Sequence, residues 1–230
     1  MRFYLPFLFV FIPFLSLAQD TSSGTAEVNN RYLEDQFYVG ITYNLLLNRP
    51  SGVSQSNLPY GLQLGYIKDI PINAERNIGF GIGLGYNFNS YSSNLQAIEE
   101  NGEISYQLIA DDVQFNRNKL ITHMVEVPIE FRWRTSSPEN YKFWRVYGGV
   151  RLGYVFANSS KFISDAERLR FSNDDLERFQ YDLYFSFGYN TWNFYASYAL
   201  NNVFKNDVVT VDGERIEMRS LKIGLIFYIL

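Results

Sequence analysis

Residues 78–88 read IGFGIGLGYNF, and this stretch decides the fold class. The even-numbered positions are Ile, Phe, Leu or Tyr, whereas the odd-numbered positions are Gly or Asn. A period of two is typical of a β-strand, because successive side chains point to opposite faces. Glycines weaken an ordinary strand, but inside a narrow barrel they leave room for large side chains from other strands. The stretch therefore predicts a barrel strand with an apolar outer face.

The same alternation recurs along the chain. Apolar residues share one face of the runs 37–45, 60–66, 125–133, 144–156, 179–189, 194–200 and 221–229. The opposite face carries Gly, Asn, Gln, Glu and Arg, which is the inverse of a soluble barrel such as a lipocalin. Aromatic residues make up 18% of the chain, as expected for aromatic girdles at two membrane interfaces. The chain is predicted to be all-β, an eight-stranded antiparallel up-and-down transmembrane β-barrel.

The lengths of the connections indicate how this barrel sits in a membrane. Three short connections, 71–77, 135–142 and 190–193, alternate with four longer ones, 48–58, 90–118, 157–178 and 205–215. Outer-membrane barrels have short periplasmic turns and longer extracellular loops. We therefore expect a bacterial outer-membrane location with both termini in the periplasm. The aromatic residues expected at the short-turn end are Trp133, Trp144, Trp192 and Phe194.

The turn signals predict how the strands pair. We place one turn near Pro138 and Glu139, and a hairpin turn at Asp212 and Gly213. The predicted opposite pairs are Trp133 with Trp144, Glu126 with Arg151, Phe204 with Leu221, and Tyr198 with Phe227. Partial alternation at 105–115 predicts that the flanking strands extend above the membrane as a hairpin. Residues 162–179, rich in both charges, predict a short helix or a mobile loop.

The N-terminal residues read as an export signal. Residues 1–18 combine Arg2, an apolar stretch and a small-residue site at Ser16 and Ala18, as in a signal peptide. Two prolines and a short apolar stretch argue against a membrane-spanning helix. We expect a flexible periplasmic tail at 19–35 and the outer-membrane β-barrel at 36–230.

Composition removes several classes of function. The formal net charge is −4 with both signs spread along the chain, so nucleic acid is not an expected partner. The chain contains no Cys, which removes disulfides, thiolate metal sites and cysteine nucleophiles. The acidic spacings do not match an EF-hand, and there is no Gly-rich phosphate loop. We expect no cofactor, no metal and no catalytic residue, and no small-molecule substrate is identified.

The inward positions of the predicted strands gather charges of both signs. A gated polar path, a site for a small anion, and an ion-pair network that fills the lumen are all consistent with them. The ion-pair network is favoured because eight strands leave no open channel. We expect Glu126 and Arg151 to be in contact. The predicted lumen network consists of Glu126, Glu130, Arg132, Arg134, Arg145, Arg151 and Asp182.

His123 is the single histidine, so a histidine-dependent hydrolase of lipids or peptides would have to use it. It lies near the outer end of its predicted strand, with Asp111 and Asp112 upstream in the second long loop. Spacing alone makes no catalytic triad. We therefore expect no enzymatic activity.

The central hairpin contains VEVPI at 125–129 and Arg132, followed beyond a turn by Tyr147, Gly148, Gly149, Gly153 and Tyr154. In these residues it resembles the PorT-like family of bacterial outer-membrane β-barrel proteins. It implies an eight-stranded barrel, and some members are similar to components of a protein-secretion system. The final residue, Leu230, departs from the aromatic residue with which such barrels usually end.

Three functions follow from these observations. The first is a non-enzymatic subunit or accessory of an envelope or protein-secretion assembly, with outer-membrane lipid and envelope or secretion proteins as partners. The second is a free-standing structural or surface-binding barrel. The third is an outer-membrane lipid-modifying or proteolytic enzyme.

Overall fold

The computed structural model of the chain describes residues 35–55, 57–110, 112–135 and 143–229. Several predicted features lie outside these described residues: the signal peptide at 1–18, the tail at 19–34, the turn residues 136–142, and Leu230. The predictions that concern those segments stay predictions.

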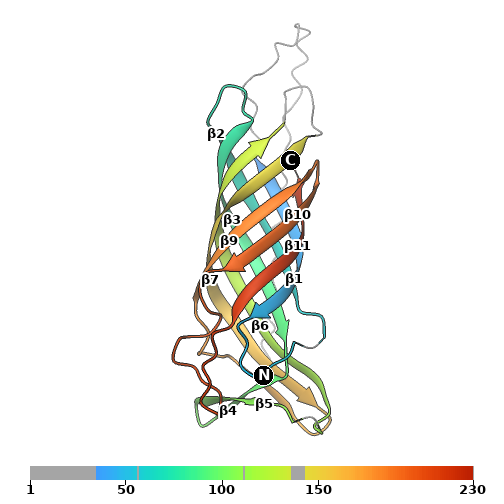
Figure 1. The fold of residues 1–230 in the computed structure, drawn as a ribbon, viewed down its shortest axis with the longest axis vertical. Helices are drawn as coiled ribbons and strands as arrows, with labels where there is room; N and C mark the ends of the chain where they lie inside the picture. The colour runs from blue at the N-terminus through green and yellow to red at the C-terminus, as the bar shows by residue number, and fades with distance from the viewer. Residues whose placement is uncertain (1–34, 56, 111, 136–142, 230) are drawn as a thin grey trace, which may run out of the picture.

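Eight long strands close into an antiparallel barrel, which confirms the predicted fold class (Figure 1). Around the barrel the order is β1, β2, β3, β6, β7, β9, β10, β11, and β11 pairs with β1. The barrel strands are β1 (Gln36–Leu47), β2 (Tyr60–Pro71), β3 (Ile78–Ser92), β6 (Phe115–Arg134), β7 (Trp144–Ser164), β9 (Phe179–Tyr189), β10 (Trp192–Ala199) and β11 (Arg219–Ile229). The described residues include no helix that could cross a membrane.

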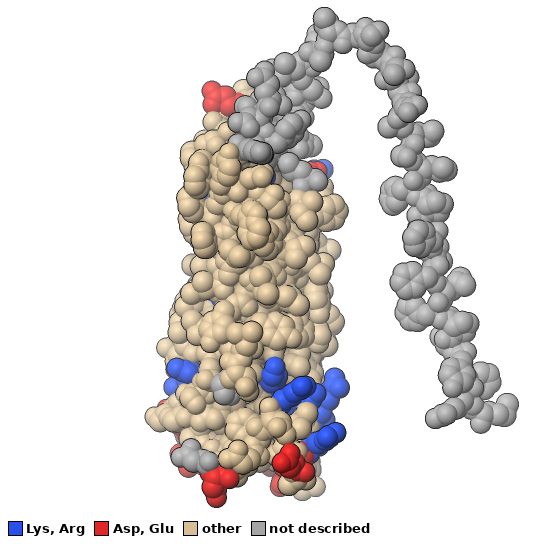
Figure 2. All heavy atoms as spheres, turned by 90° about the vertical axis from the view of Figure 1, so that its right-hand side faces the viewer, with Lys and Arg blue, Asp and Glu red and all other residues tan. Residues whose placement is uncertain are grey.

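The outer face of the barrel is apolar, as the alternation predicts. On β3, Phe80 is 49% exposed and Leu84 is 61% exposed, while the glycines between them face the interior. On the face drawn in Figure 2, a broad middle band carries no charged side chain, and charged groups gather at the two ends. This arrangement suits a hydrocarbon layer about 25 Å thick between two polar interfaces.

The glycines of β3 are required by the side chains that oppose them. A Cβ atom at Gly81 would lie 2.7 Å from Arg132 Nε and 2.8 Å from Ile67 Cγ2. A Cβ atom at Gly85 would overlap the hydroxyl of Tyr38. The glycine strand therefore makes room for large side chains of β1, β2 and β6, namely Tyr38, Ile67 and Arg132.

Extra strands lie at the long-loop end, which is the lower end of Figure 1. β4 (Leu95–Glu100) and β5 (Glu103–Leu108) form a separate two-stranded hairpin. The prediction that this region simply extends the flanking strands is thus wrong in part, because the sequence turns back at Asn101 and Gly102, both of which have positive φ. β8 (Arg168–Phe171) pairs with the end of β7, so the third long loop forms a hairpin and not a helix or a mobile loop.

The predicted register of the central hairpin is shifted by two residues. Trp133 lies opposite Val146, not Trp144, and Glu126 lies opposite Gly153, not Arg151. Next to the last described pair, Arg134 with Arg145, the Thr135 amide donates to the Trp144 carbonyl at 3.0 Å, which agrees with the shifted register. Because the shift is even, every side chain keeps its predicted face.

The predicted register of the last hairpin is shifted by six residues. Tyr198 lies opposite Leu221, not Phe227, and Phe204 belongs to no strand. The turn at Asp212 and Gly213 does form, but it lies inside a loop that runs from 200 to 218. The cause is burial, because the apolar side chains of this loop pack inward against the other loops instead of extending the sheet.

We predict that Gly85→Ala destabilises the barrel by about 1–3 kcal/mol, because the added methyl group displaces the Tyr38 hydroxyl from its packed position. Urea unfolding in lipid vesicles measures this change. Gly148→Ala is the matched control, since a Cβ atom there meets nothing nearer than 3.6 Å and should cost less than about 0.5 kcal/mol. Equal effects of the two substitutions would contradict the prediction.

Candidate functional site

The barrel interior brings most of the predicted charges into contact. Alternation turns the odd positions of β2 and the even positions of β6 and β11 inward. The odd positions of β7 also face inward as far as Val155, after which a β-bulge at Phe156 reverses the parity, so that the odd positions beyond it face outward. The resulting contacts form three layers along the barrel axis, each with ions of both signs. Buried ions are tolerated only when they are paired, so a charged residue fits the lumen only where its layer supplies a partner of opposite charge.

The layer nearest the short turns is centred on Asp69. Its carboxylate accepts two hydrogen bonds from Arg134, at 2.8 and 2.7 Å, and one from Arg132 at 3.1 Å. Arg132 Nε also donates to Glu130 at 2.7 Å, and the Tyr184 hydroxyl donates to the other oxygen of Glu130. Two arginines and two carboxylates thus neutralise one another, with every side chain in the layer buried.

The middle layer is centred on Arg151. Its Nη1 lies 3.0 Å from Glu126 Oε1 and also donates to the Gln63 side chain. The contact with Glu126 runs diagonally, because Arg151 lies opposite Pro128, two residues further along β6. Glu126 also accepts from the Tyr38 hydroxyl at 2.8 Å and from Asn87 Nδ2 at 3.0 Å.

Tyrosine rings complete the surroundings of Arg151. The guanidinium carbon lies 4.5 Å from the ring centre of Tyr184, 4.9 Å from that of Tyr195 and 5.4 Å from that of Tyr38. Ring faces attract a cation most strongly where water is excluded. The middle layer therefore holds its cation by one carboxylate and three aromatic rings.

The third layer, toward the long loops, pairs Asp182 with Lys222. Lys222 Nζ lies 3.0 Å from Asp182 Oδ2, and the Ser197 hydroxyl donates to the same oxygen at 3.2 Å. Both charged side chains are less than a tenth exposed. Six of the seven predicted network residues therefore lie in ion pairs.

Arg145 is the predicted network residue that the structure places apart. Its guanidinium donates to the Asn190 carbonyl and lies 4.4 Å from the ring centre of Phe143 and 5.8 Å from that of Tyr228. It thus closes the short-turn end of the lumen through a backbone acceptor and two rings. Contacts of this kind stabilise the barrel.

Two ionised members of the lumen network, Asp69 and Lys222, were not predicted. Asp69 lies in the extension of β2 beyond the run at 60–66, where the apolar alternation is interrupted by Lys68. Lys222 lies inside the last run on its inward face. Both residues occupy positions that alternate with the outward apolar residues of their strands, and this alternation would have identified them as inward.

The long-loop end of the barrel is closed by a buried apolar cluster, here called the loop cap. All four long connections contribute to it, and backbone hydrogen bonds join them, such as that from the Val211 amide to the Tyr106 carbonyl at 2.9 Å. The buried members are Leu46, Val53, Tyr91, Leu95, Tyr106, Leu176, Val203, Phe204, Val208, Ile216 and Met218. The loops therefore share a core of their own.

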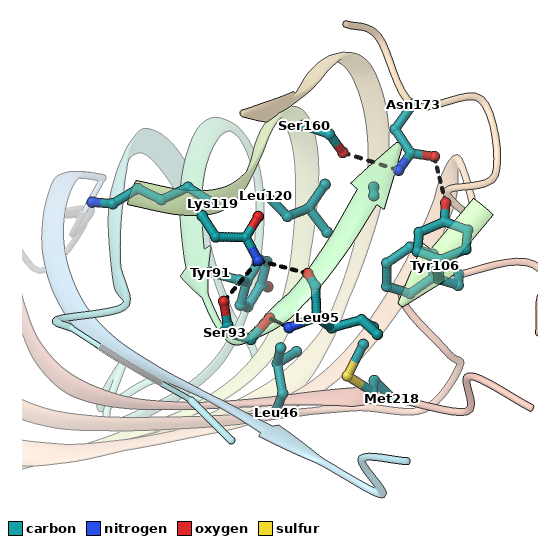
Figure 3. Close-up of a pocket in the computed structure, with 13 residues that line it drawn as sticks. Leu46, Tyr91, Ser93, Leu95, Tyr106, Lys119, Leu120, Ser160, Asn173 and Met218 are labelled. Atoms are coloured by element: carbon teal, nitrogen blue, oxygen red, sulfur yellow. Dashed lines mark hydrogen bonds between the residues drawn. The ribbon is translucent and has the colours of Figure 1, made fainter. Parts of the chain in front are cut away.

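A small cavity lies among the side chains of the loop cap (Figure 3). Tyr91, Leu95 and Tyr106 line it, together with Asn173, whose oxygen accepts from the Tyr106 hydroxyl at 3.0 Å. Burial raises the pKa of the Tyr106 hydroxyl, which therefore stays protonated and donates. The cavity has a volume of about 30 Å³, and a second one near Lys222 has about 10 Å³. These volumes suit one or two water molecules and no larger ligand.

His123 lies on the outer face of β6 among aromatic rings. Its Nδ1 is hydrogen bonded to the Tyr86 hydroxyl at 2.7 Å, and its ring lies 5.3 Å from that of Phe88. Among the described residues no serine or carboxylate is hydrogen bonded to it, and Asp111 lies outside them. No group of three or more acidic or histidine side chains in the described ranges could hold a metal ion. The arrangement around His123 is that of an aromatic cluster.

We predict that Glu126→Gln lowers the free energy of unfolding by about 3–5 kcal/mol, because Arg151 then keeps a buried charge without its carboxylate. Arg151→Gln should cost a similar amount, and the double variant should cost less than the sum by about 1–3 kcal/mol. Unfolding in lipid vesicles measures the four states of this cycle. Arg178→Gln, which breaks an exposed pair with Asp174, is the control and should change stability by less than about 0.5 kcal/mol. Additive effects in the buried cycle would contradict the prediction.

The match to a protein family agrees with the geometry. Residues 17–205 match the family described as "Outer membrane protein beta-barrel domain". The chain is also similar to the solved structure of Ail, the attachment invasion locus protein of Yersinia pestis, in complex with the heparin analogue sucrose octasulfate. That similarity has 17% identity and a TM-score of 0.37, over 85% of this chain and 99% of that one. A mutant of the Rh. blastica porin matches with 9% identity and a TM-score of 0.22, over 86% of this chain and all of the other.

No curated protein matches the chain in sequence. The family match covers most of the chain, and the closed barrel has the outward apolar face that the outer membrane requires. The chain therefore belongs to the outer membrane protein β-barrel domain family and is an outer-membrane β-barrel protein.

Proposed function

We propose that this protein is a non-enzymatic subunit or accessory of an envelope or protein-secretion assembly, and that it acts through its loops and its outer face. The observation that carries the proposal is the packed lumen, where buried ion pairs occupy the path that a transported solute would need. The loop cap adds a second closed layer at one end of the same path. A barrel closed in this way offers its surface, and not its interior, to a partner.

The loops support a binding role because they are organised. Ser51 donates from its backbone amide to Glu214 at 2.9 Å, and the Asn94 amide donates to the Ser54 carbonyl at 3.1 Å. Exposed apolar side chains remain on this ordered surface, including Val211 at 61% and Leu58 at 66%. Ordered loops with exposed apolar groups are suited to bind a protein at low entropic cost.

The resemblance to the PorT-like family supports the secretion part of the proposal. Its motif residues Glu126 and Pro128 lie at the middle layer of the lumen, beside Arg151. They hold the barrel together and would not themselves contact a partner. The resemblance therefore favours a shared barrel core, while the partner would be selected by the loops.

A free-standing surface-binding barrel is the second candidate. The extension of β6, β7 and β8 favours it, because three paired strands continue past the rest of the barrel at the long-loop end. Such an extension presents a rigid face whether or not a second protein is bound.

We predict that chemical cross-linking in whole cells, followed by detergent extraction of the tagged protein, recovers a large partner in stoichiometric amount. Mass spectrometry and native gel size measure this outcome. Extraction from cells that express an untagged copy is the control. A lone monomer, with no cross-linked species, would contradict the assembly role and support the free-standing barrel.

We predict that the long loops face the outside of the cell. The chain has no Cys, so a single introduced cysteine reports its own location. Asp212→Cys in the last long loop should react with a membrane-impermeant maleimide in intact cells. Ala74→Cys, in the short turn between β2 and β3, is the matched control and should react only after the outer membrane is opened. Labelling with the opposite pattern would reverse the proposed orientation.

A further inference from the structure

Five basic side chains gather on the outer face of the β6–β7–β8 extension. Lys119 lies opposite Lys161, and Lys161 lies opposite Arg170, so three cations form one row across three adjacent strands. Arg117 and Arg168 both pair with Ile163 and form a second row beyond the first. We call these five residues the basic face: Arg117, Lys119, Lys161, Arg168 and Arg170.

The basic face lies just beyond the hydrocarbon-facing band. The outward side chains of β6 run from Trp133 at the short-turn end to Ile121, and Lys119 is the next outward position. Twelve residues at about 3.3 Å each, tilted by about 40°, span about 30 Å along the barrel axis. Lys119 therefore lies where the lipid headgroups begin. Figure 2 shows Lys and Arg next to the charge-free band, with Asp and Glu at the tip beyond them.

The fold does not neutralise this face. Within the described residues none of the five cations lies in an ion pair, whereas the lumen cations Arg132, Arg151 and Lys222 all do. The contacts on the basic face are neutral: Lys119 Nζ lies 5.9 Å from the ring centre of Tyr60, and Arg170 Nε donates to Ser159 at 3.3 Å.

Acidic residues lie at the edge of this face. Asp165 and Glu167 occupy the turn between β7 and β8, and Asp165 accepts from Asn116 at 3.3 Å.

Like charges directly opposite one another in a sheet are destabilising. A row of three cations on adjacent strands therefore favours the binding of an external anion.

We propose that the basic face binds the phosphate groups of a phosphorylated glycolipid in the outer leaflet of the outer membrane. The side chains project sideways at headgroup height, so the ligand they meet is a lipid and not a solute above the loops. Arginine binds phosphate in a bidentate manner and lysine as a point charge. The aromatic cluster of Tyr86, Phe88, His123 and Phe156 lies on the membrane side of the row and would contact the sugar and upper acyl region.

The lipid source rests on the proposed orientation, because only the outer leaflet carries this lipid when the long loops are outside. The binding site itself does not depend on orientation when the pure protein is studied. Cysteine labelling in cells therefore tests the orientation, and lipid binding by the purified protein tests the site. The two can fail separately.

The experiment titrates diphosphoryl lipid A into the purified full chain in phosphatidylcholine nanodiscs. The triple variant Lys119→Gln, Lys161→Gln and Arg170→Gln should bind on the order of 100-fold more weakly, given the usual contribution of each cation at an anionic lipid surface. The matched control removes the same charge elsewhere, by Lys68→Gln, Lys205→Gln and Arg215→Gln, and should bind within about 3-fold of the wild type. If the triple variant does not fold, Lys161→Gln alone should weaken binding about 5-fold.

The chemical class of the ligand is tested with two further probes. Lipid A without phosphates should bind the wild type as weakly as diphosphoryl lipid A binds the triple variant. Heparin, a soluble polyanion, should compete poorly with diphosphoryl lipid A. Equal binding of phosphorylated and dephosphorylated lipid A, wild-type affinity of the triple variant, or a preference for heparin would each overturn the proposal.

Discussion

A charge in the interior of an eight-stranded barrel must find its counter-charge inside the same narrow space, and the structure depends on this constraint. Arg151 shows how it is met, with Glu126 at 3.0 Å and three tyrosine rings around the guanidinium. The glycines of β3 follow from it, because Gly85 leaves space for the Tyr38 hydroxyl that donates to Glu126. Small residues on one strand and large polar residues on the facing strands are thus two halves of one packing solution.

The two ends of the barrel are closed by different physical means. At the short turns the closure is ionic, through Asp69 and its two arginines. At the long loops it is apolar, through a cluster to which every long connection contributes. An ionic closure fixes geometry through directed hydrogen bonds, while an apolar closure depends on the buried area of several loops at once. The loops therefore form a cooperative unit, and a function carried by one loop is supported by the others.

The sequence predicts local pattern much better than it predicts distant pairing. Alternation within each run depends only on neighbouring residues. It therefore correctly predicts the barrel, the direction that each face points, and the number of barrel strands. Register depends on where a loop prefers to be buried, and this preference leaves no periodic signal. Phe204 and Ile216 look like strand residues by composition, yet they join the loop cap. Asp69 was missed for a related reason, because its strand continues past the clear apolar run.

The charged side chains of the lumen differ from those on the basic face, because the lumen charges stabilise the fold and the charges of the basic face are available to a ligand. In the lumen, Arg132, Arg151 and Lys222 each have a carboxylate within 3.1 Å. Their charges are therefore balanced within the folded barrel. On the β6–β7–β8 extension, basic residues occupy directly opposite positions of the register, and their side-chain contacts are a ring and a hydroxyl. Packing alone gives no reason to align like charges on neighbouring strands, since the alignment costs stability. The membrane surface gives one, because an anionic headgroup layer at that height converts the repulsion into attraction.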